Sequence, residues 1–115
     1  MKYSNLLVWQ KAMDLVTDIY KLTATFPAEE RFGLSSQARR AAVSIPSNIA
    51  EGHGRKSSGA YMNHIFIALG LLMELETQIQ TAFRLSLMSE IATSELLTKT
   101  DEIGKMLSGL KKSIS

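Results

Sequence analysis

The sequence contains no cysteine and only two prolines among its 115 residues. The lack of cysteine excludes disulfide bonds and thiolate metal sites, so the chain does not require an oxidising compartment. Long apolar runs are also absent, because IFIALGLLMELE is interrupted by Glu74 and Glu76 and is too short to span a bilayer. The opening MKYSNLLVWQ has no cleavage site of the signal-peptide type. We therefore expect a cytoplasmic protein that makes no membrane contact.

The residues that are present favour one globular unit. Apolar residues make up 45% of the chain, which is enough for a core and too many for a disordered segment. The length is that of one ordinary domain, and the sequence shows neither an internal repeat nor a long linker. We predict a single domain over residues 1–115.

Helical periodicity occurs in four stretches, and no strand-like alternation of useful length is found. The stretches cover about residues 5–25, 35–52, 58–86 and 89–112. Ser35 or Ser36 is expected to cap the second helix, and Gly52 and Gly54 to end it. Short connections favour antiparallel neighbours, so the pattern predicts an all-α fold, an antiparallel up-down-up-down four-helix bundle.

Pro46 lies in the middle of the second predicted helix. A proline there removes one backbone donor and costs about 3 kcal/mol relative to alanine, so we predict a helix kinked at Pro46. One interpretation is that the kink bends the helix around the bundle. The other is that the strip of Val43, Pro46 and Ala50 lets a second subunit approach closely.

The third predicted helix is apolar over more of its surface than one small bundle needs. Its central stripe is extended on both flanks. Together with the strip on the second helix, these flanks predict self-association into a symmetric ring or dimer. The predicted interface residues are Val43, Pro46, Ala50, Phe66, Ile67, Leu71 and Met73.

Basic residues are concentrated between residues 31 and 56 and at the C-terminus. In the loop GHGRKSSG, two glycines, two cations and a helix start suit phosphate contacts, although a solvated turn between two helix caps explains it too. We expect Arg39 or Arg40 to pair with Glu51, Glu74 or Glu76. The candidate nucleic-acid-binding residues are Arg39, Arg40, Arg55, Lys56, Lys111 and Lys112.

Catalytic and metal-binding patterns are missing from the sequence. His53 and His64 are the only histidines, and the Glu-x-x-His motif of di-iron bundles is absent. The serines fall at caps and turns without a nearby His–acid pair. We therefore expect no enzymatic activity, no catalytic residue, no metal, no cofactor and no small-molecule substrate.

Three segments resemble the proteins encoded in intervening sequences of bacterial 23S ribosomal RNA genes. They are LLVWQKAMDLVTDIY, FPAEERFGLSSQARRAAVSIPSNIAEGHGR and IALGLLMELETQI. The chain departs from the family pattern at Leu71, where serine is common. The resemblance implies a four-helix bundle, a homo-oligomer that is a pentamer, no established enzymatic activity, and RNA binding through a basic surface. The alternative is a protein–protein scaffold or an accessory subunit, for example of a reverse transcriptase, that does not touch nucleic acid.

Overall fold

The computed structural model describes residues 2–114, and these residues form helices joined by short turns. No strand occurs among the described residues, which confirms the predicted all-α class. The elements are the short 3-10 helices η1 (Tyr3–Asn5) and η2 (Ala28–Glu30) and the helices α1 (Leu7–Thr23), α2 (Leu34–His53), α3 (Ser58–Arg84) and α4 (Glu90–Ile114).

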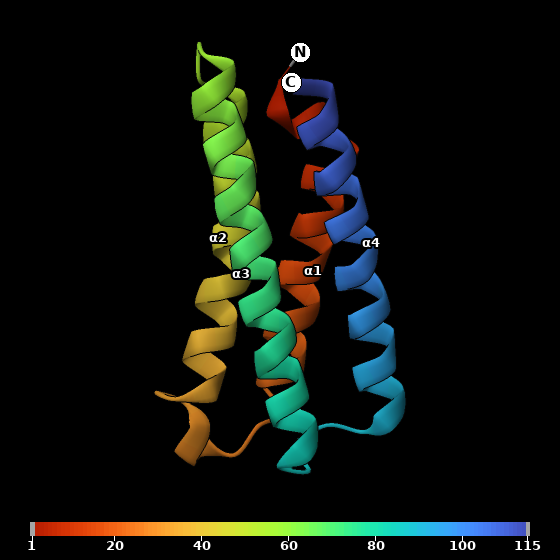
Figure 1. Cartoon of the computed structure of the whole chain (residues 1–115). Coiled ribbons are helices and arrows are strands. Elements are labelled where there is room, and N and C mark those ends of the chain that lie inside the picture. The colour runs from red at the N-terminus through yellow and green to blue at the C-terminus, as the bar shows by residue number, and fades with distance from the viewer. Residues whose placement is uncertain (1, 115) are drawn as a thin grey trace.

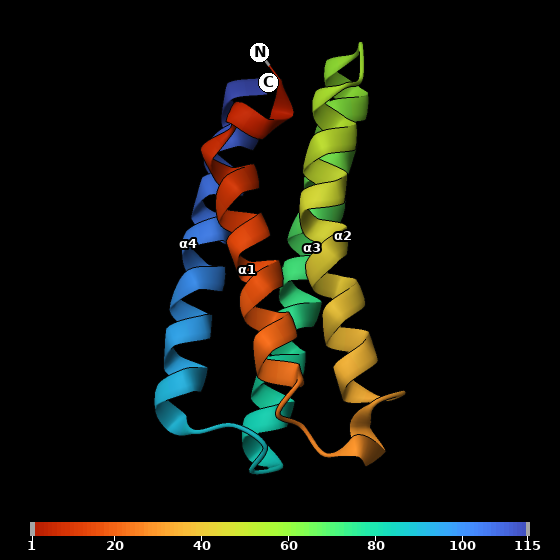
Figure 2. The same ribbon diagram turned by 180° about the vertical axis from the view of Figure 1, so that it is seen from behind.

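The four helices pack side by side as a bundle (Figure 1). Successive helices run in opposite directions, so both termini lie at the end that carries the turn between α2 and α3 (Figures 1 and 2). Each helix contacts its neighbours in the chain, and α4 closes the bundle by contacting α1. The bundle measures 43 × 24 × 20 Å. This arrangement separates two ends that differ in their charged residues.

The core is built from one stripe of each helix. The spacing of these stripes is that of an amphipathic helix, which buries residues three and four positions apart. In α3 the stripe leads from Ile65 through Leu72 to Ile79, and none of these side chains is more than 3% exposed. The largest side chains that are fully buried are Leu15, Ile19, Ile45, Ile49, Ile65, Leu72, Leu75, Thr100, Ile103 and Leu107.

Two of the helix starts are fixed by serine side chains. Ser57 Oγ accepts a hydrogen bond from the Ala60 N–H of α3 at 3.1 Å, and Ser89 Oγ accepts one from the Ala92 N–H of α4 at 3.1 Å. Each bond satisfies an amide that has no partner inside its own helix. The predicted beginnings of the third and fourth helices are therefore confirmed to within a residue.

The limits of α2 lie close to the predicted ones, and Gly54 ends the helix as predicted, but Ser35, Ser36 and Gly52 do not have the predicted roles. The helix begins at Leu34 after Gly33, and no side chain caps it, so neither Ser35 nor Ser36 has the predicted role. At the other end α2 continues through Gly52 to His53, and Gly54 is its C-cap. Gly52 lies inside the helix, and the lack of a side chain there lets α2 pack closely against α3. A Cβ on Gly52 would lie 2.7 Å from His64 Cβ of α3.

Pro46 lies inside α2, which stays helical on both sides of it. The Ser47 hydroxyl donates to the Val43 carbonyl at 2.9 Å, and Asn48 Nδ2 donates to the Ser44 carbonyl at 2.9 Å. Polar side chains thus bond the helix backbone around the proline. Pro46 itself is buried in its own chain, at a groove between α2 and the segment of η1 and α1. The kink at Pro46 stays a prediction.

Ion pairs join α1 to α4, the pair of neighbouring helices in least contact. Lys99 Nζ lies 2.6 Å from Asp18 Oδ2, and Lys11 Nζ lies 3.5 Å from Glu102 Oε1. The hydrogen bond to Asp18 raises the pKa of Lys99 above its ordinary value. Because these groups are largely exposed, such pairs position α4 more than they stabilise it.

Candidate nucleic-acid interface

Four of the predicted binding residues lie at one end of the bundle. Arg55 and Lys56 are in the turn between α2 and α3, and Lys111 and Lys112 are in the last turn of α4. Figure 1 shows both segments at the end where the termini lie. We call this group, Arg55, Lys56, Lys111 and Lys112, the basic end. The sequence analysis missed Lys2, which is exposed and adjoins the same end of the bundle.

Cations from neighbouring segments lie on two sides of the first half of α3. Arg55 Nε lies 3.4 Å from His64 Nε2, and Lys111 Nζ lies 5.1 Å from the centroid of the Phe66 ring. His64 and Phe66 are two residues apart, so they point to different sides of the helix. The basic end therefore spans from the turn before α3 to the last turn of α4.

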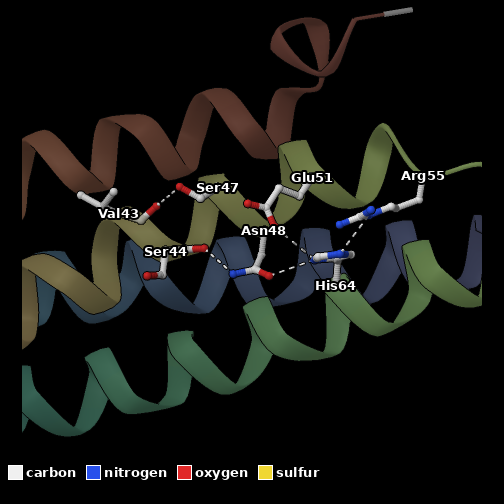
Figure 3. A network of polar contacts seen from close by, with 7 residues as sticks. All are labelled: Val43, Ser44, Ser47, Asn48, Glu51, Arg55 and His64. Carbon is white, nitrogen blue, oxygen red and sulfur yellow. Dashed lines mark hydrogen bonds and ion pairs between the residues drawn. The ribbon is translucent and has the colours of Figure 1, made fainter.

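A chain of hydrogen bonds orients Arg55 (Figure 3). The amide nitrogen of Asn48 donates to the Ser44 carbonyl, so Asn48 Oδ1 is left to accept from His64 Nδ1 at 3.0 Å. With its proton on Nδ1, His64 accepts the Arg55 N–H at Nε2. The terminal nitrogens of Arg55 make no hydrogen bond or ion pair within residues 2–114, so they remain available to an anion.

A second contact holds the end of α2 against α3. The Tyr61 hydroxyl lies 3.1 Å from His53 Nδ1, and the two rings meet edge to face at 5.7 Å between centroids. Burial raises the pKa of Tyr61 above its ordinary value, so its hydroxyl keeps its proton at neutral pH. The turn that carries Arg55 and Lys56 therefore starts from a fixed helix end.

Arg39 and Arg40 lie on α2, away from the basic end. Arg39 Nε donates to Thr23 Oγ1 at 2.7 Å, its Nη2 donates to the Tyr20 carbonyl at 3.3 Å, and its guanidinium lies 4.6 Å from the Tyr20 ring centroid. A cation at the C-terminal end of α1 also suits the helix dipole. Arg40 is exposed, and its side chain makes no hydrogen bond, ion pair or ring contact within residues 2–114.

The predicted pairing of Arg39 or Arg40 with Glu51, Glu74 or Glu76 is wrong for residues 2–114. The ion pairs of this part of the chain involve lysines and His64, and Glu51 Oε2 lies 3.9 Å from His64 Nδ1. The physical reason is that α2 turns Arg39 towards α1, where a hydroxyl and a carbonyl oxygen accept hydrogen bonds from two of its nitrogens.

Replacing Arg39 by alanine is expected to lower the free energy of unfolding by about 1.5–3 kcal/mol, because hydrogen bonds to a charged group and a cation–π contact are lost. Arg40→Ala is the matched control, since the neighbouring arginine has no contact to lose and should change stability by less than about 0.5 kcal/mol. Urea denaturation followed by circular dichroism measures both values. Equal effects of the two substitutions would contradict the assigned role of Arg39.

The predicted interface residues differ in exposure. Val43 on α2 and the α3 residues Phe66, Ile67 and Met73 are exposed, Phe66 by 54%. Ala50 and Leu71 are half-buried, and Pro46 is buried within its own chain. The seven-residue spacing of Phe66 and Met73 places them on one flank of α3, and Ile67 lies on another. An apolar surface thus remains uncovered on α3, as the sequence analysis predicted.

Two features that would indicate other functional classes are a metal-binding cluster and a membrane-spanning helix. Within residues 2–114, no cluster of three or more histidine, aspartate or glutamate side chains is placed to hold a metal ion. None of the helices in this range combines the length and hydropathy needed to cross a membrane.

Comparison with known proteins assigns the chain to a family. The family model described as 23S rRNA-intervening sequence protein matches residues 4–109. A similar fold is seen in the crystal structure of a protein with unknown function from the S23 ribosomal protein family of Bacteroides thetaiotaomicron. That structure has a TM-score of 0.86 and 26% sequence identity over 97% of this chain and 99% of its own. No curated protein matches the chain. Since the family model covers nearly the whole sequence, this chain belongs to the 23S rRNA-intervening sequence protein family.

Proposed function

We propose that the protein assembles into a homo-oligomer that binds structured RNA through its basic end. The observation that carries the proposal is that Arg55 and Lys56 of the α2–α3 turn lie at the same end of the bundle as Lys111 and Lys112 of the last turn of α4. Lysine and arginine at fixed positions bind the phosphate backbone and release its counterions. The resemblance to the family also implies RNA binding.

The arginine of the turn is suited to phosphate. Its Nε is held by His64, so the guanidinium loses less freedom when its terminal nitrogens bind two phosphate oxygens. Lys56 follows in the same turn and adds a second charge, and the first amides of α3 point towards the same region. Contacts of this kind recognise the shape and backbone of a helix of RNA rather than its sequence.

Assembly would strengthen this binding. The exposed flanks of α3, with Phe66, Ile67 and Met73, offer apolar surface to other copies of the chain. The resemblance to the family implies a pentamer. In a ring whose axis follows the bundle, cyclic symmetry places every basic end on one face, which multiplies the local positive potential.

The RNA-binding proposal is tested by the double change Arg55→Ala with Lys56→Ala. We expect the affinity for a labelled RNA hairpin, measured by fluorescence anisotropy at low salt, to fall at least about tenfold because two phosphate contacts are lost. The control removes the same charge from the opposite end with Lys21→Ala and Arg84→Ala, and it should leave the affinity within about twofold. Equal affinities of the two variants would favour the alternative, a protein–protein scaffold or accessory subunit.

The assembly is tested by light scattering of the purified protein. We expect a mass about five times the 12.7 kDa of one chain. The single change Met73→Glu should lower this mass, because burying a carboxylate in an apolar interface is unfavourable. Gln80→Glu adds the same charge to an exposed polar position of α3 and serves as the control. A monomer at all concentrations would contradict the proposed oligomer while leaving the RNA experiment meaningful.

A further inference from the structure

A polar cavity lies at the end of the bundle opposite the basic end. It has a volume of about 300 Å³ and opens between the end of α1, η2 and the beginning of α2. Its lining residues are Thr23, Ala24, Phe26, Pro27, Ala28, Arg31, Ser35 and Arg39. The charged residues in this lining are two arginines, and no acidic residue is part of it. Glu29 and Glu30 of η2 do not line the cavity, although Glu30 Oε1 lies 3.6 Å from the position that a Cβ on Gly33 would occupy.

The cavity is bounded by the N-terminal end of a long helix. Helix α2 has 20 residues, and its N-cap residue, Gly33, offers no side chain to the first amides. Unpaired amides and the positive end of the helix dipole favour an anion at such a place. The start of a helix alone does not define a binding site, so the side chains that line the cavity must supply further contacts.

Ser35 provides an independent observation. The residue is only 6% exposed, it lines the cavity, and its hydroxyl makes no hydrogen bond within residues 2–114. The hydroxyl oxygen itself is not closed off from solvent, because Gln78 Oε1 is the atom of the described side chains that is buried without a partner. The Ser35 hydroxyl is therefore reached from the cavity that its residue lines. An oxygen-bearing ligand in the cavity would supply the missing bond.

The two arginines have donors to spare. Arg39 uses Nε and Nη2 on Thr23 and the Tyr20 carbonyl, which fixes its guanidinium at the cavity wall and leaves Nη1 without a bond in the described chain. Arg31 lies 5.8 Å from the Phe32 ring centroid and forms no ion pair within residues 2–114. A preoriented guanidinium and a second one from the lining of the same cavity are suited to a tetrahedral oxyanion.

We infer that this cavity binds a phosphate group, held by Arg31, Arg39, the Ser35 hydroxyl and the first amides of α2. The phosphate is either free inorganic phosphate or the terminal phosphate of an oligonucleotide, because both present the same oxygens. The site is separate from the basic end. Phosphate binding in the cavity therefore goes beyond the proposed function, and it can be absent while RNA still binds at the basic end, or the reverse.

Calorimetric titration with inorganic phosphate, at an ionic strength kept constant with chloride, tests the site. We expect saturable binding that weakens about tenfold in Arg31→Gln, because a charge-assisted hydrogen bond is lost, and about threefold in Ser35→Ala. Arg84→Gln, at the same end of the bundle but outside the cavity, should bind phosphate as the unmodified protein does. Circular dichroism establishes that each variant is folded.

A second titration identifies the source of the phosphate. A dinucleotide with a 5′-phosphate is compared with the same dinucleotide ending in a 5′-hydroxyl. Binding of the phosphorylated form alone, weakened by Arg31→Gln, supports the site and shows that it accepts a nucleic-acid terminus. Binding of inorganic phosphate alone supports the site with free phosphate as its ligand. No saturable binding of either, or binding that Arg31→Gln and Ser35→Ala leave unchanged, would overturn the inference.

Discussion

Replacing Leu72 by alanine is expected to lower the free energy of unfolding by about 2–5 kcal/mol, the largest effect of any change considered for this protein. Leu72 is fully buried in the stripe of α3. It lies against α4, because a Cβ added to Gly104 would be 3.4 Å from Leu72 Cδ2. Truncation removes apolar area and leaves a cavity that the surrounding helices fill only in part.

The control for Leu72 is the same substitution at Leu85. That residue directly follows α3 and is 57% exposed, so Leu85→Ala should change stability by less than about 0.5 kcal/mol. Thermal and urea denaturation give both values. A loss below about 1 kcal/mol for Leu72→Ala would mean that α3 and α4 do not meet at this position.

Replacing Gly52 by alanine is expected to destabilise the protein by about 1–3 kcal/mol, even though alanine is the better helix former. The added Cβ would lie 2.7 Å from His64 Cβ and 3.1 Å from Tyr61 Cδ1. The His64 Cβ is fixed to the backbone of α3, so relief requires the two helices to move apart. That movement would also lengthen the hydrogen bond that His64 donates to Asn48. It would thereby change the orientation of Arg55, which His64 holds.

Gly70 is the matched control for Gly52. It also lies inside a helix, but an added Cβ would meet nothing within 4 Å. Gly70→Ala should therefore stabilise the protein by up to about 1 kcal/mol through helix propensity alone. Opposite signs for the two substitutions are the expected result of urea denaturation. The same sign for both would show that α2 and α3 do not approach closely at Gly52.

The sequence was sufficient to predict the four helices because their signals are local. Apolar spacing over 17–27 residues defines α1, α3 and α4, and Ser57 and Ser89 mark two starts within one turn. The role of Gly52 near the end of α2 was misassigned because tertiary packing decides it. Glycine is typical of a helix end, yet the role of Gly52 is to allow close packing against His64 and Tyr61, which belong to α3.

The candidate site was predictable in composition and not in arrangement. The basic loop and the basic C-terminus are visible in the sequence, but their presence at one end follows from the antiparallel order of the helices. The partners of Arg39 were missed because Thr23 lies 16 residues away and carries no charge that a sequence pattern would reveal. The cavity at Ser35 was missed for the same reason, since it is formed by residues from three elements.

The central claim is that RNA phosphates bind at the basic end, and salt dependence tests it most directly. The affinity for an RNA hairpin is measured between low and moderate salt for the unmodified protein and for Arg55→Ala with Lys56→Ala. The account predicts a steep linear fall of log affinity with log salt, with a slope that decreases by about one for each cation removed. A slope that is near zero, or that is identical in the double variant, would contradict it.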